Sequence, residues 1–258
     1  MLRAVLSTLF WVFLGLSSAL LYPVALVLYA LTAPFSARRA LLHTFTCFWA
    51  SLYTWLNPAW RVEIVGREKM DPAKTYVMVA NHLSFLDVLI LFRLFRHFKW
   101  VSKIENFRIP FIGWNMSLNG YIKLRWGQRE SVERMFAQCE HALANGSSVM
   151  MFPEGTRSPT GRLRAFKTGA FELAKRAGSP ILPLVIEGTA SALPKSGFVI
   201  QGRHAIKVSV LDEIPAAEVA ALPVEALTLA VHARIADVLG EPPMLEVAPS
   251  PAAVTRSG

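Results

Sequence analysis

A histidine and an aspartate stand five positions apart in the stretch VANHLSFLD, residues 79–87. An aspartate that bonds one imidazole nitrogen fixes the tautomer, so that the other nitrogen can accept a proton from a substrate. His82 and Asp87 could therefore form a general base and its orienting partner. The same stretch could instead be a polar turn in which Ser84 or Asp87 caps a helix. Spacing alone leaves both interpretations open.

A second polar loop follows another apolar run in the stretch VMMFPEGTRSPTGRLRAFKTGAF, residues 149–171. A glycine lets the backbone approach a ligand closely, an arginine fork matches phosphate geometry, and hydroxyl groups add hydrogen bonds. The loop therefore predicts a pocket for a phosphate or a carboxylate. The alternative is a solvated basic loop that contacts membrane lipid. The spacing from Gly155 to Gly161, with no Gly-Lys-Ser/Thr ending, excludes a P-loop.

Both loops must be positioned by regular elements, and the chain alternates short apolar runs with helical patterns. This alternation predicts an α/β domain over residues 59–240, with a mixed sheet flanked by helices. Ligands of such sheets bind beyond the carboxyl ends of strands, where both loops are expected. The expected strands are 60–65, 75–80, 98–102, 148–152, 181–186 and 205–210, and the expected helices are about 85–95, 130–144, 167–177 and 224–239.

The first 58 residues are almost free of charge. No Asp, Glu, Lys or Arg occurs in 4–37 or in 40–60, and the second run is rich in aromatic residues, which favour the membrane interface. About 20 apolar residues suffice to cross a bilayer, so residues 1–58 are predicted to form an apolar helical hairpin or membrane anchor. A cleaved signal peptide is the alternative, but its apolar region spans only about 7–15 residues. A single span, a hairpin and a re-entrant pair all remain open.

Composition narrows the choice of partners. Hydrophobic residues make up 53% of the chain and charged residues 17%, and the formal net charge is +9. Without a nucleic-acid-binding motif, an anionic membrane surface is the simpler partner. Cys47 and Cys139 each lie among apolar residues, so no disulfide framework is indicated, and we expect a membrane protein whose active site faces the cytoplasm.

We expect neither regular structure in the C-terminal tail nor a metal site. Residues 241–258 are rich in Pro, Ala and Ser and are predicted to be a disordered tail. The remaining histidines are dispersed without ligand spacing, so no metal site is expected. The sequence indicates no oligomeric state.

The stretches NHLSFLD and FPEGTRS together resemble signature blocks of the glycerolipid acyltransferase family, typified by 1-acylglycerol-3-phosphate acyltransferases. WVSKIENFRIPFIGWNMSLNGYIKLR, residues 100–125, and ILPLVIEG, residues 181–188, are similar to two further blocks of that family. The four blocks occur in order, and the resemblance covers roughly residues 61–215. An ordered set of four is far more specific than either outer block alone.

The resemblance implies acyl transfer from a thioester, acyl-CoA or acyl carrier protein, to the free hydroxyl of a lysophospholipid. It favours 1-acylglycerol-3-phosphate as acceptor and implies no cofactor beyond the thioester co-substrate. His82 would be the general base and Asp87 its orienting partner. The residues that would bind the acceptor are Glu154, Gly155, Thr156, Arg157, Lys103 and Arg125.

One position departs from the family pattern. Many members end the second block with Phe-Ile-Asp-Arg, whereas residues 122–125 read IKLR and place Leu124 at the acidic position. Acceptors such as lyso-ornithine lipid therefore remain an alternative. Two alternatives lie outside this reaction class: a lipid or thioester hydrolase in which His82 activates water, and a catalytically inactive membrane-lipid binder.

Overall fold

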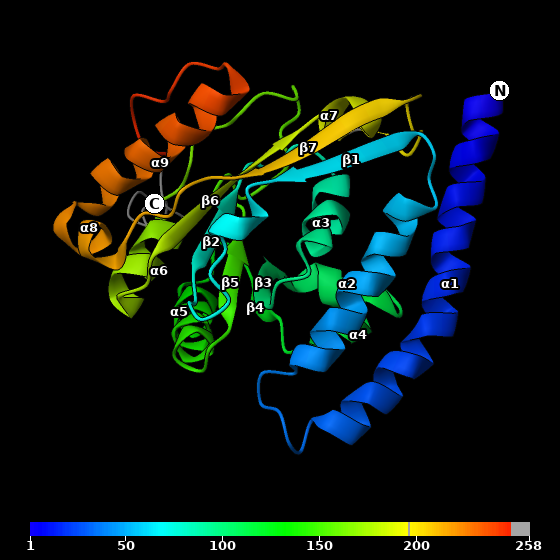
Figure 1. Ribbon diagram of the computed structural model, residues 1–258, viewed down its shortest axis with the longest axis horizontal. Coiled ribbons are helices and arrows are strands. Elements are labelled where there is room, and N and C mark those ends of the chain that lie inside the picture. The colour runs from blue at the N-terminus through cyan, green and yellow to red at the C-terminus, as the bar shows by residue number, and fades with distance from the viewer. Residues whose placement is uncertain (196, 249–258) are drawn as a thin grey trace.

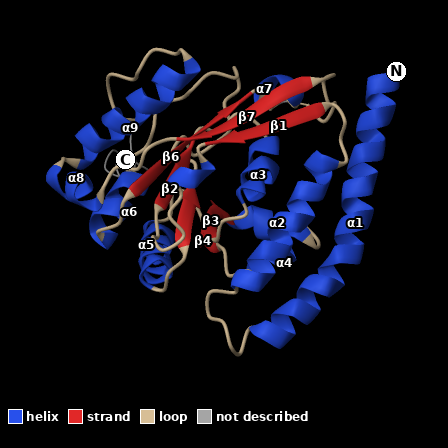
Figure 2. Cartoon of the chain, viewed as in Figure 1, coloured by secondary structure: helices blue, strands red, loops and turns tan. Residues whose placement is uncertain are grey.

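Seven strands form one mixed sheet with helices on both faces (Figure 1, Figure 2). The structure is a computed structural model, and it describes residues 1–195 and 197–248. The order across the sheet is β1-β7-β6-β2-β5-β3-β4. The strands are β1 (Trp60–Val65), β2 (Val77–Ala80), β3 (Phe98–Lys103), β4 (Ile122–Leu124), β5 (Ser148–Met151), β6 (Ile181–Glu187) and β7 (His204–Val210). The predicted α/β class with a mixed sheet is confirmed.

The helices alternate with these strands along the chain. The α-helices of the described residues are α1 (Leu2–Thr32), α2 (Ala40–Trp55), α3 (Leu86–Leu91), α4 (Ile112–Leu118), α5 (Arg129–Ala144), α6 (Gly169–Ala177), α7 (Thr189–Ala192), α8 (Ala216–Ala221) and α9 (Val224–Leu239). Short 3-10 helices are η1 (Arg67–Lys69), η2 (Phe92–Leu94) and η3 (Ile104–Arg108). The helix expected over 85–95 is thus α3 continued by η2.

Two elements near the second block escaped prediction. β4 has only three residues, and its middle residue, Lys123, is exposed, so no apolar run marks it. α4 follows Phe111, whose φ of 59° and ψ of −55° make a tight turn that sequence patterns do not reveal. Both elements lie at the end of the sheet that holds β3, and both contribute to the cavity described below.

The polar loops meet because the strands that precede them run parallel in the sheet. Pairing is parallel throughout except between β6 and β7. Parallel neighbours bring their carboxyl ends to one edge. His82 follows β2, Glu154 follows β5, and Lys103 ends β3, so all three come to the same edge although 72 residues separate His82 from Glu154.

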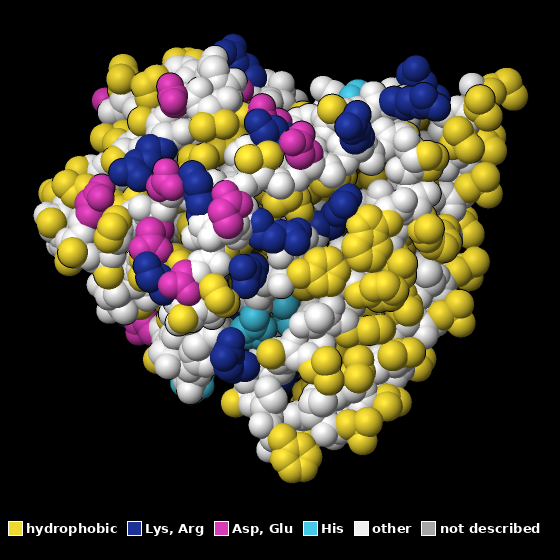
Figure 3. Space-filling model, viewed as in Figure 1, with side chains coloured by type: hydrophobic (Ala, Val, Ile, Leu, Met, Phe, Trp, Pro, Cys, Tyr) yellow, Lys and Arg dark blue, Asp and Glu magenta, His cyan; other side chains and the backbone are white. Residues whose placement is uncertain are grey.

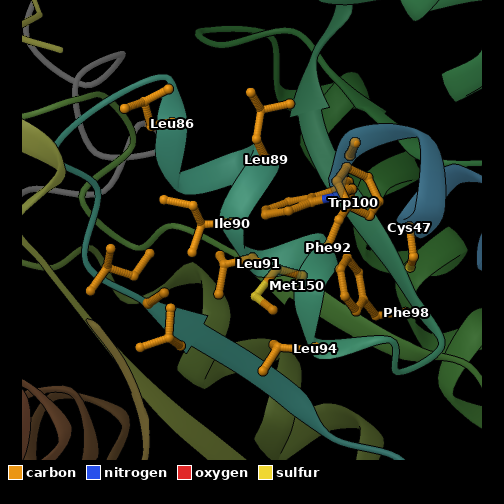
Figure 4. Close-up of a cluster of buried hydrophobic side chains, with 14 of the residues drawn as sticks. Cys47, Leu86, Leu89, Ile90, Leu91, Phe92, Leu94, Phe98, Trp100 and Met150 are labelled. Carbon is orange, nitrogen blue, oxygen red and sulfur yellow. The ribbon is translucent and has the colours of Figure 1, made fainter. Parts of the chain in front are cut away.

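Residues of the central strand alternate between two cores. Met78 and Ala80 enter the core shared with α1, α2 and α3, whereas Val77 and Val79 enter the core shared with α5, α6 and α9. A strand covered on both faces reads as a continuous apolar run, which explains why β2 was easy to predict. Figure 4 shows part of the first core, where Leu91 and Phe98 lie close to Met150 of β5.

The two N-terminal helices form the predicted apolar hairpin, and their burial differs. α2 packs between α1 and the first core, and its buried residues include Leu42, Cys47 and Trp49. α1 lies on the outside, with few buried residues along its 31-residue length. Within the described residues, α1 is the helix long and apolar enough to cross a membrane by length and composition.

Two cations fasten the hairpin turn to the carboxyl end of α4. Arg39 donates from Nη1 to the carbonyl of Leu118 at 2.6 Å. The buried Lys99 donates from Nζ to the carbonyls of Arg38 at 2.8 Å and Asn119 at 2.6 Å. Cations near the free carbonyls of a helix end are favourable because they satisfy those acceptors and oppose the helix dipole. Burial, together with the charges of Arg39 and Arg38, lowers the pKa of Lys99 to about 8.

The first part of the tail predicted to be disordered lies against the domain. Glu241 accepts a hydrogen bond from the Leu163 N–H at 2.9 Å, and the Ala248 N–H donates to the Phe166 carbonyl at 3.0 Å. Residues 241–248 therefore cover the chain around 163–166. Residues 249–258 lie outside the described residues.

Gly188 ends β6 with a φ of +83°, and a Cβ built there would lie 2.2 Å from the Ala205 carbonyl oxygen of β7. Gly178 also has positive φ, +58°, but open space around it. We expect Gly188→Ala to cost more than about 3 kcal/mol of stability, and Gly178→Ala about 1 to 2 kcal/mol, because only the first must push a strand aside. Thermal unfolding of the two variants compares them. Equal losses would show that the clash is relieved cheaply.

Candidate active site

The loop after β2 brings His82 and Asp87 into direct contact. His82 Nδ1 lies 2.9 Å from Asp87 Oδ2. The same oxygen accepts hydrogen bonds from the backbone N–H groups of Leu83 at 2.6 Å and Ser84 at 2.8 Å. Asp87 is fully buried, so these bonds replace the water that its charge would otherwise need. The aspartate therefore both closes the turn and holds one nitrogen of the imidazole, so a polar turn and a direct His82–Asp87 contact occur together.

The other nitrogen of the imidazole is free to act. A carboxylate oxygen accepts from Nδ1–H, so Nε2 keeps its lone pair in the neutral ring. His82 is 15% exposed and lines a cavity. Asn81, just before it, holds the end of β2 to β6 through two bonds of 2.8 Å with the backbone of Ile186. His82 is thus presented from a rigid strand end.

The loop after β5 grips the backbone of His82 from both sides. Glu154 Oε1 accepts from the His82 N–H at 2.7 Å, and the Ser158 N–H donates to the His82 carbonyl at 2.8 Å. Glu154 is 3% exposed, and its second oxygen has no hydrogen-bond partner among the described residues. It does not line the cavity, although the resemblance places it in the acceptor-binding block. In this structure its contact is with the backbone of the candidate base.

The environment of Glu154 favours its neutral form. The pKa of Glu154 is raised to about 8, chiefly by burial. The negative charge of Asp87 contributes to this rise, whereas the hydrogen bond from the His82 N–H and the interactions with Arg164 oppose it. A protonated Glu154 avoids placing two negative charges side by side in a buried site.

A cavity of about 410 Å³ opens beside His82. One part is polar and basic, lined by Lys103, Arg157 and Lys167 together with Gly155 and Thr156. The other part is apolar and lies between the N-terminal helices, α3 and the chain from η3 to β4; its lining includes Leu14, Trp49, Val88, Leu89, Phe92, Ile112, Met116 and Leu124. The lining contains no Asp or Glu within the described part of the chain. The site suits a molecule with an anionic head and a long apolar body.

Most of the predicted acceptor-binding residues meet at this cavity. Lys103, Gly155, Thr156 and Arg157 line it, whereas Arg125 lies on the surface outside it. The Arg157 backbone is fixed by Lys195 Nζ, which donates to its carbonyl at 2.7 Å.

Lys167 and Trp126 also line the cavity beside Gly155, and neither was among the predicted site residues. Lys167 Nζ lies 4.5 Å from the ring centre of Trp126, a cation–π contact, and both side chains face Gly155. Burial lowers the pKa of Lys167, as do the positive charges of Arg164 and Lys103. Such crowding of cations indicates a place for an anion. Lys167 belonged to the basic run after Gly155 and could have been included on that ground; Trp126 carried no sequence signal.

Nothing in residues 1–195 or 197–248 forms a group of three or more His, Cys, Asp or Glu side chains suited to a metal ion. Both cysteines are buried, and burial raises the pKa of the Cys47 thiol to about 12. Neither cysteine lines the cavity.

The sequence is similar to known acyltransferases. The family model described as Acyltransferase matches residues 61–187. The chain is 44% identical over 158 residues to a 1-acyl-sn-glycerol-3-phosphate acyltransferase of Chlamydomonas reinhardtii, covering 61% of this chain and 47% of the relative. It is 30% identical over 197 residues to the enzyme of that name from Pseudomonas aeruginosa, covering 76% of each. The chain spans about half the length of the first curated relatives it matches.

A solved structure shares the fold. The crystal structure of the 1-acyl-sn-glycerophosphate (LPA) acyltransferase PlsC from Thermotoga maritima superposes with a TM-score of 0.74 at 19% identity. The match covers 92% of this chain and 96% of that chain, so the N-terminal helices and the α/β domain share one architecture.

The burial of Glu154 predicts a pH-dependent stability. Between pH 4.5 and about 8 the folded protein holds a proton that the unfolded chain has released, so stability falls as pH rises through this range. Glu154→Gln is neutral at every pH and keeps an oxygen for the His82 N–H. At pH 8 we expect this variant to raise the free energy of unfolding by on the order of 1 to 4 kcal/mol, measured as a higher melting temperature. At pH 5 we expect little change in either quantity.

The control is Glu225→Gln in the exposed first turn of α9, which removes one charge without a buried environment. A gain for Glu154→Gln that is equal at pH 5 and pH 8 would contradict a protonated glutamate at this position.

Proposed function

The chain belongs to the acyltransferase family, and from that membership we propose that it moves a fatty acyl group from a thioester to the free hydroxyl of a lysophospholipid. The proposed acceptor is 1-acylglycerol-3-phosphate, which yields phosphatidate, and the proposed donor is acyl-CoA or acyl carrier protein. The observation that carries the proposal is the single cavity that His82 lines together with three cations and a set of apolar side chains. Relatives at 30–44% identity bear the name 1-acyl-sn-glycerol-3-phosphate acyltransferase.

In this mechanism His82 is the general base. Its Nε2 removes the proton of the acceptor hydroxyl as the hydroxyl oxygen attacks the thioester carbonyl carbon. Asp87 stabilises the imidazolium that forms, through the 2.9 Å bond to Nδ1. When the carbon–sulfur bond breaks, the thiolate takes the proton back from His82. The products are the diacyl lipid and the free thiol, and the enzyme forms no covalent intermediate.

The charges of the cavity favour a phosphate-bearing acceptor. Lys103, Arg157 and Lys167 line it with no carboxylate among the described lining residues. Lyso-ornithine lipid, the alternative acceptor, is a zwitterion with one carboxylate and one ammonium group, so a lining of three cations attracts it less than a phosphate monoester. Leu124 is 4% exposed and lines the same cavity, so the position where many family members carry an acid is apolar here. Leu124 therefore adds no negative charge to this lining.

We propose that the outer face of α1 enters the membrane. Beyond its first two turns its large exposed residues are apolar and include Leu9 and Leu16, whereas the buried side of the helix holds Ser7 and Ser18. Ser18 contacts the buried Tyr53 hydroxyl of α2 at 3.2 Å. A helix that turns hydroxyls inward and large apolar side chains outward is arranged for lipid rather than water.

The surface supports this membrane orientation. Figure 3 shows apolar side chains covering the flank of the molecule formed by α1, while charged groups gather over the rest of that view. A membrane-bound acceptor would then reach the cavity, to which α1 contributes Leu14, without leaving the lipid. Reduced, buried cysteines accord with an active site that faces the cytoplasm.

The reaction is tested with purified protein, lysophosphatidate and other lysolipids, and both donor types, with mass spectrometry of the products. We expect phosphatidate from lysophosphatidate, and a loss of about 100-fold or more in kcat for His82→Ala, because the base is removed. Asp87→Asn should lose activity with little change in KM, because it misorients the imidazole. His141→Ala, on the exposed face of α5, is the matched control.

Each alternative has its own signature in that assay. Free fatty acid without diacyl product would favour a hydrolase over a transferase. Product from lyso-ornithine lipid alone would replace the proposed acceptor. An unchanged rate in His82→Ala would remove His82 from the mechanism and favour a lipid binder.

Membrane docking is tested by co-sedimentation with vesicles of phosphatidylcholine and phosphatidylglycerol. We expect the double variant Leu9→Gln, Leu16→Gln to bind at least about tenfold more weakly, because two large apolar side chains no longer enter lipid. The matched control replaces Val238 and Leu245, which are exposed near the C-terminal helix α9, with Gln. Equal binding by both double variants would overturn the assignment of the α1 face.

A further inference from the structure

We propose that Phe152 is a positioning residue for His82, whose ring plane it fixes so that Nε2 points at the acceptor hydroxyl. The inference deepens the proposed function and rests on it, because it assumes that His82 is the base. Phe152 follows β5 directly, between the strand and the loop that holds Glu154. Its side chain and that of His82 both line the cavity.

The two rings are stacked face to face. Their centroids lie 3.9 Å apart, and their planes differ by only 6°. This is the shortest separation and the smallest interplanar angle among the aromatic pairs of the described residues. Parallel rings at this separation are in van der Waals contact, so the imidazole cannot tilt toward Phe152 without a clash.

The bond to Asp87 alone does not fix the imidazole. A hydrogen bond holds the ring at Nδ1, but such a bond weakens only gradually as its angle departs from linearity, so the ring keeps some freedom of rotation about the Cβ–Cγ bond. Such a rotation carries Nε2 away from any fixed position in the cavity. A flat surface against the ring removes that freedom. Asp87 and Phe152 therefore supply different constraints, one on the edge of the ring and one on its plane.

Phe152 is itself held in place. Trp100 of β3 packs against it with centroids 5.3 Å apart and an angle of 31°. Trp100 is 4% exposed and in turn contacts Phe98 and Phe92, as Figure 4 shows for these three labelled rings. The Phe152 carbonyl accepts from the Gly155 N–H at 3.0 Å, which fixes its backbone. The orientation of the base is thus anchored in the first hydrophobic core.

The stack also favours the transition state. When His82 takes the hydroxyl proton, it becomes a cation, and the face of an aromatic ring attracts a cation placed within about 6 Å. A neutral imidazole gains little from that attraction. An interaction that strengthens as the proton moves accelerates the chemical step, whereas substrate binding is largely unaffected. Loss of Phe152 should therefore appear in kcat more than in KM.

The test compares Phe152→Leu, which keeps apolar bulk but removes the flat π face, with Phe152→Tyr, which keeps the face. We expect Phe152→Leu to lower kcat by about 10- to 100-fold, with the KM for lysophosphatidate within about twofold of wild type. Phe152→Tyr should recover most of the rate. Phe136→Leu, a buried substitution on α5 that lies outside the cavity, controls for the destabilisation that any loss of a buried ring causes.

A second measurement does not depend on activity. In a sample with labelled histidines, the ring current of Phe152 should shift the His82 imidazole protons upfield, and these resonances are assigned by their absence in His82→Gln. Phe152→Leu should move them downfield, whereas Phe136→Leu should leave them in place. If they do not move in Phe152→Leu, the stack is absent and the proposal is wrong.

The kinetic outcomes separate this inference from the proposed function. A folded Phe152→Leu with wild-type kcat, a loss confined to KM, or a folded Phe152→Tyr as slow as Phe152→Leu would each overturn the positioning role while leaving acyl transfer intact. A wild-type protein that forms no diacyl product would overturn the proposed function, and the resonance shift would then still decide whether Phe152 holds the ring.

Discussion

The site depends on one contact between distant parts of the chain, the hydrogen bond from the His82 N–H to the buried carboxyl of Glu154. With the Ser158 N–H on the His82 carbonyl, it joins the loop after β2 to the loop after β5. Strand pairing brings the two loops to one edge, but pairing ends at Met151, before either loop begins. The cations of the second loop are therefore held at a fixed distance from the imidazole by side-chain and backbone bonds beyond the sheet.

Sequence periodicity was enough to find the strands buried on both faces. β2, β5 and β6 differ from prediction by one or two residues at an end, because continuous apolar runs mark them. The edge strand β1 has the predicted bounds because polar and apolar residues alternate along it. β4 escaped because three residues with an exposed lysine carry no such pattern. In the site, too, only the features with a local sequence pattern could be predicted. His82 and Asp87 are close in the chain and their contact was foreseeable, whereas the burial of Glu154 and the position of Trp126 depend on how separate loops pack.

The two uncharged N-terminal runs show that composition does not reveal whether an apolar helix is covered by protein or by lipid. Both are apolar, yet α2 buries Leu42, Cys47 and Trp49 within the protein, and α1 leaves most of its large side chains outside. Hydropathy measures how much a segment avoids water and does not say whether protein or lipid replaces the water. The small hydroxyl residues on the inner side of α1 were the available clue, because they mark the side that packs closely on a neighbouring helix.

The attachment of the hairpin turn to α4 by Arg39 and Lys99 has a mechanical consequence. These bonds join the turn after α1 to α4 and to β3, the strand that ends at the cavity residue Lys103. On the proposed docking, the depth of α1 in the bilayer fixes the height of the base above the acyl chains. Such an enzyme would select acceptor hydroxyls that lie at one depth in the membrane. Its rate would then depend on the thickness of the bilayer.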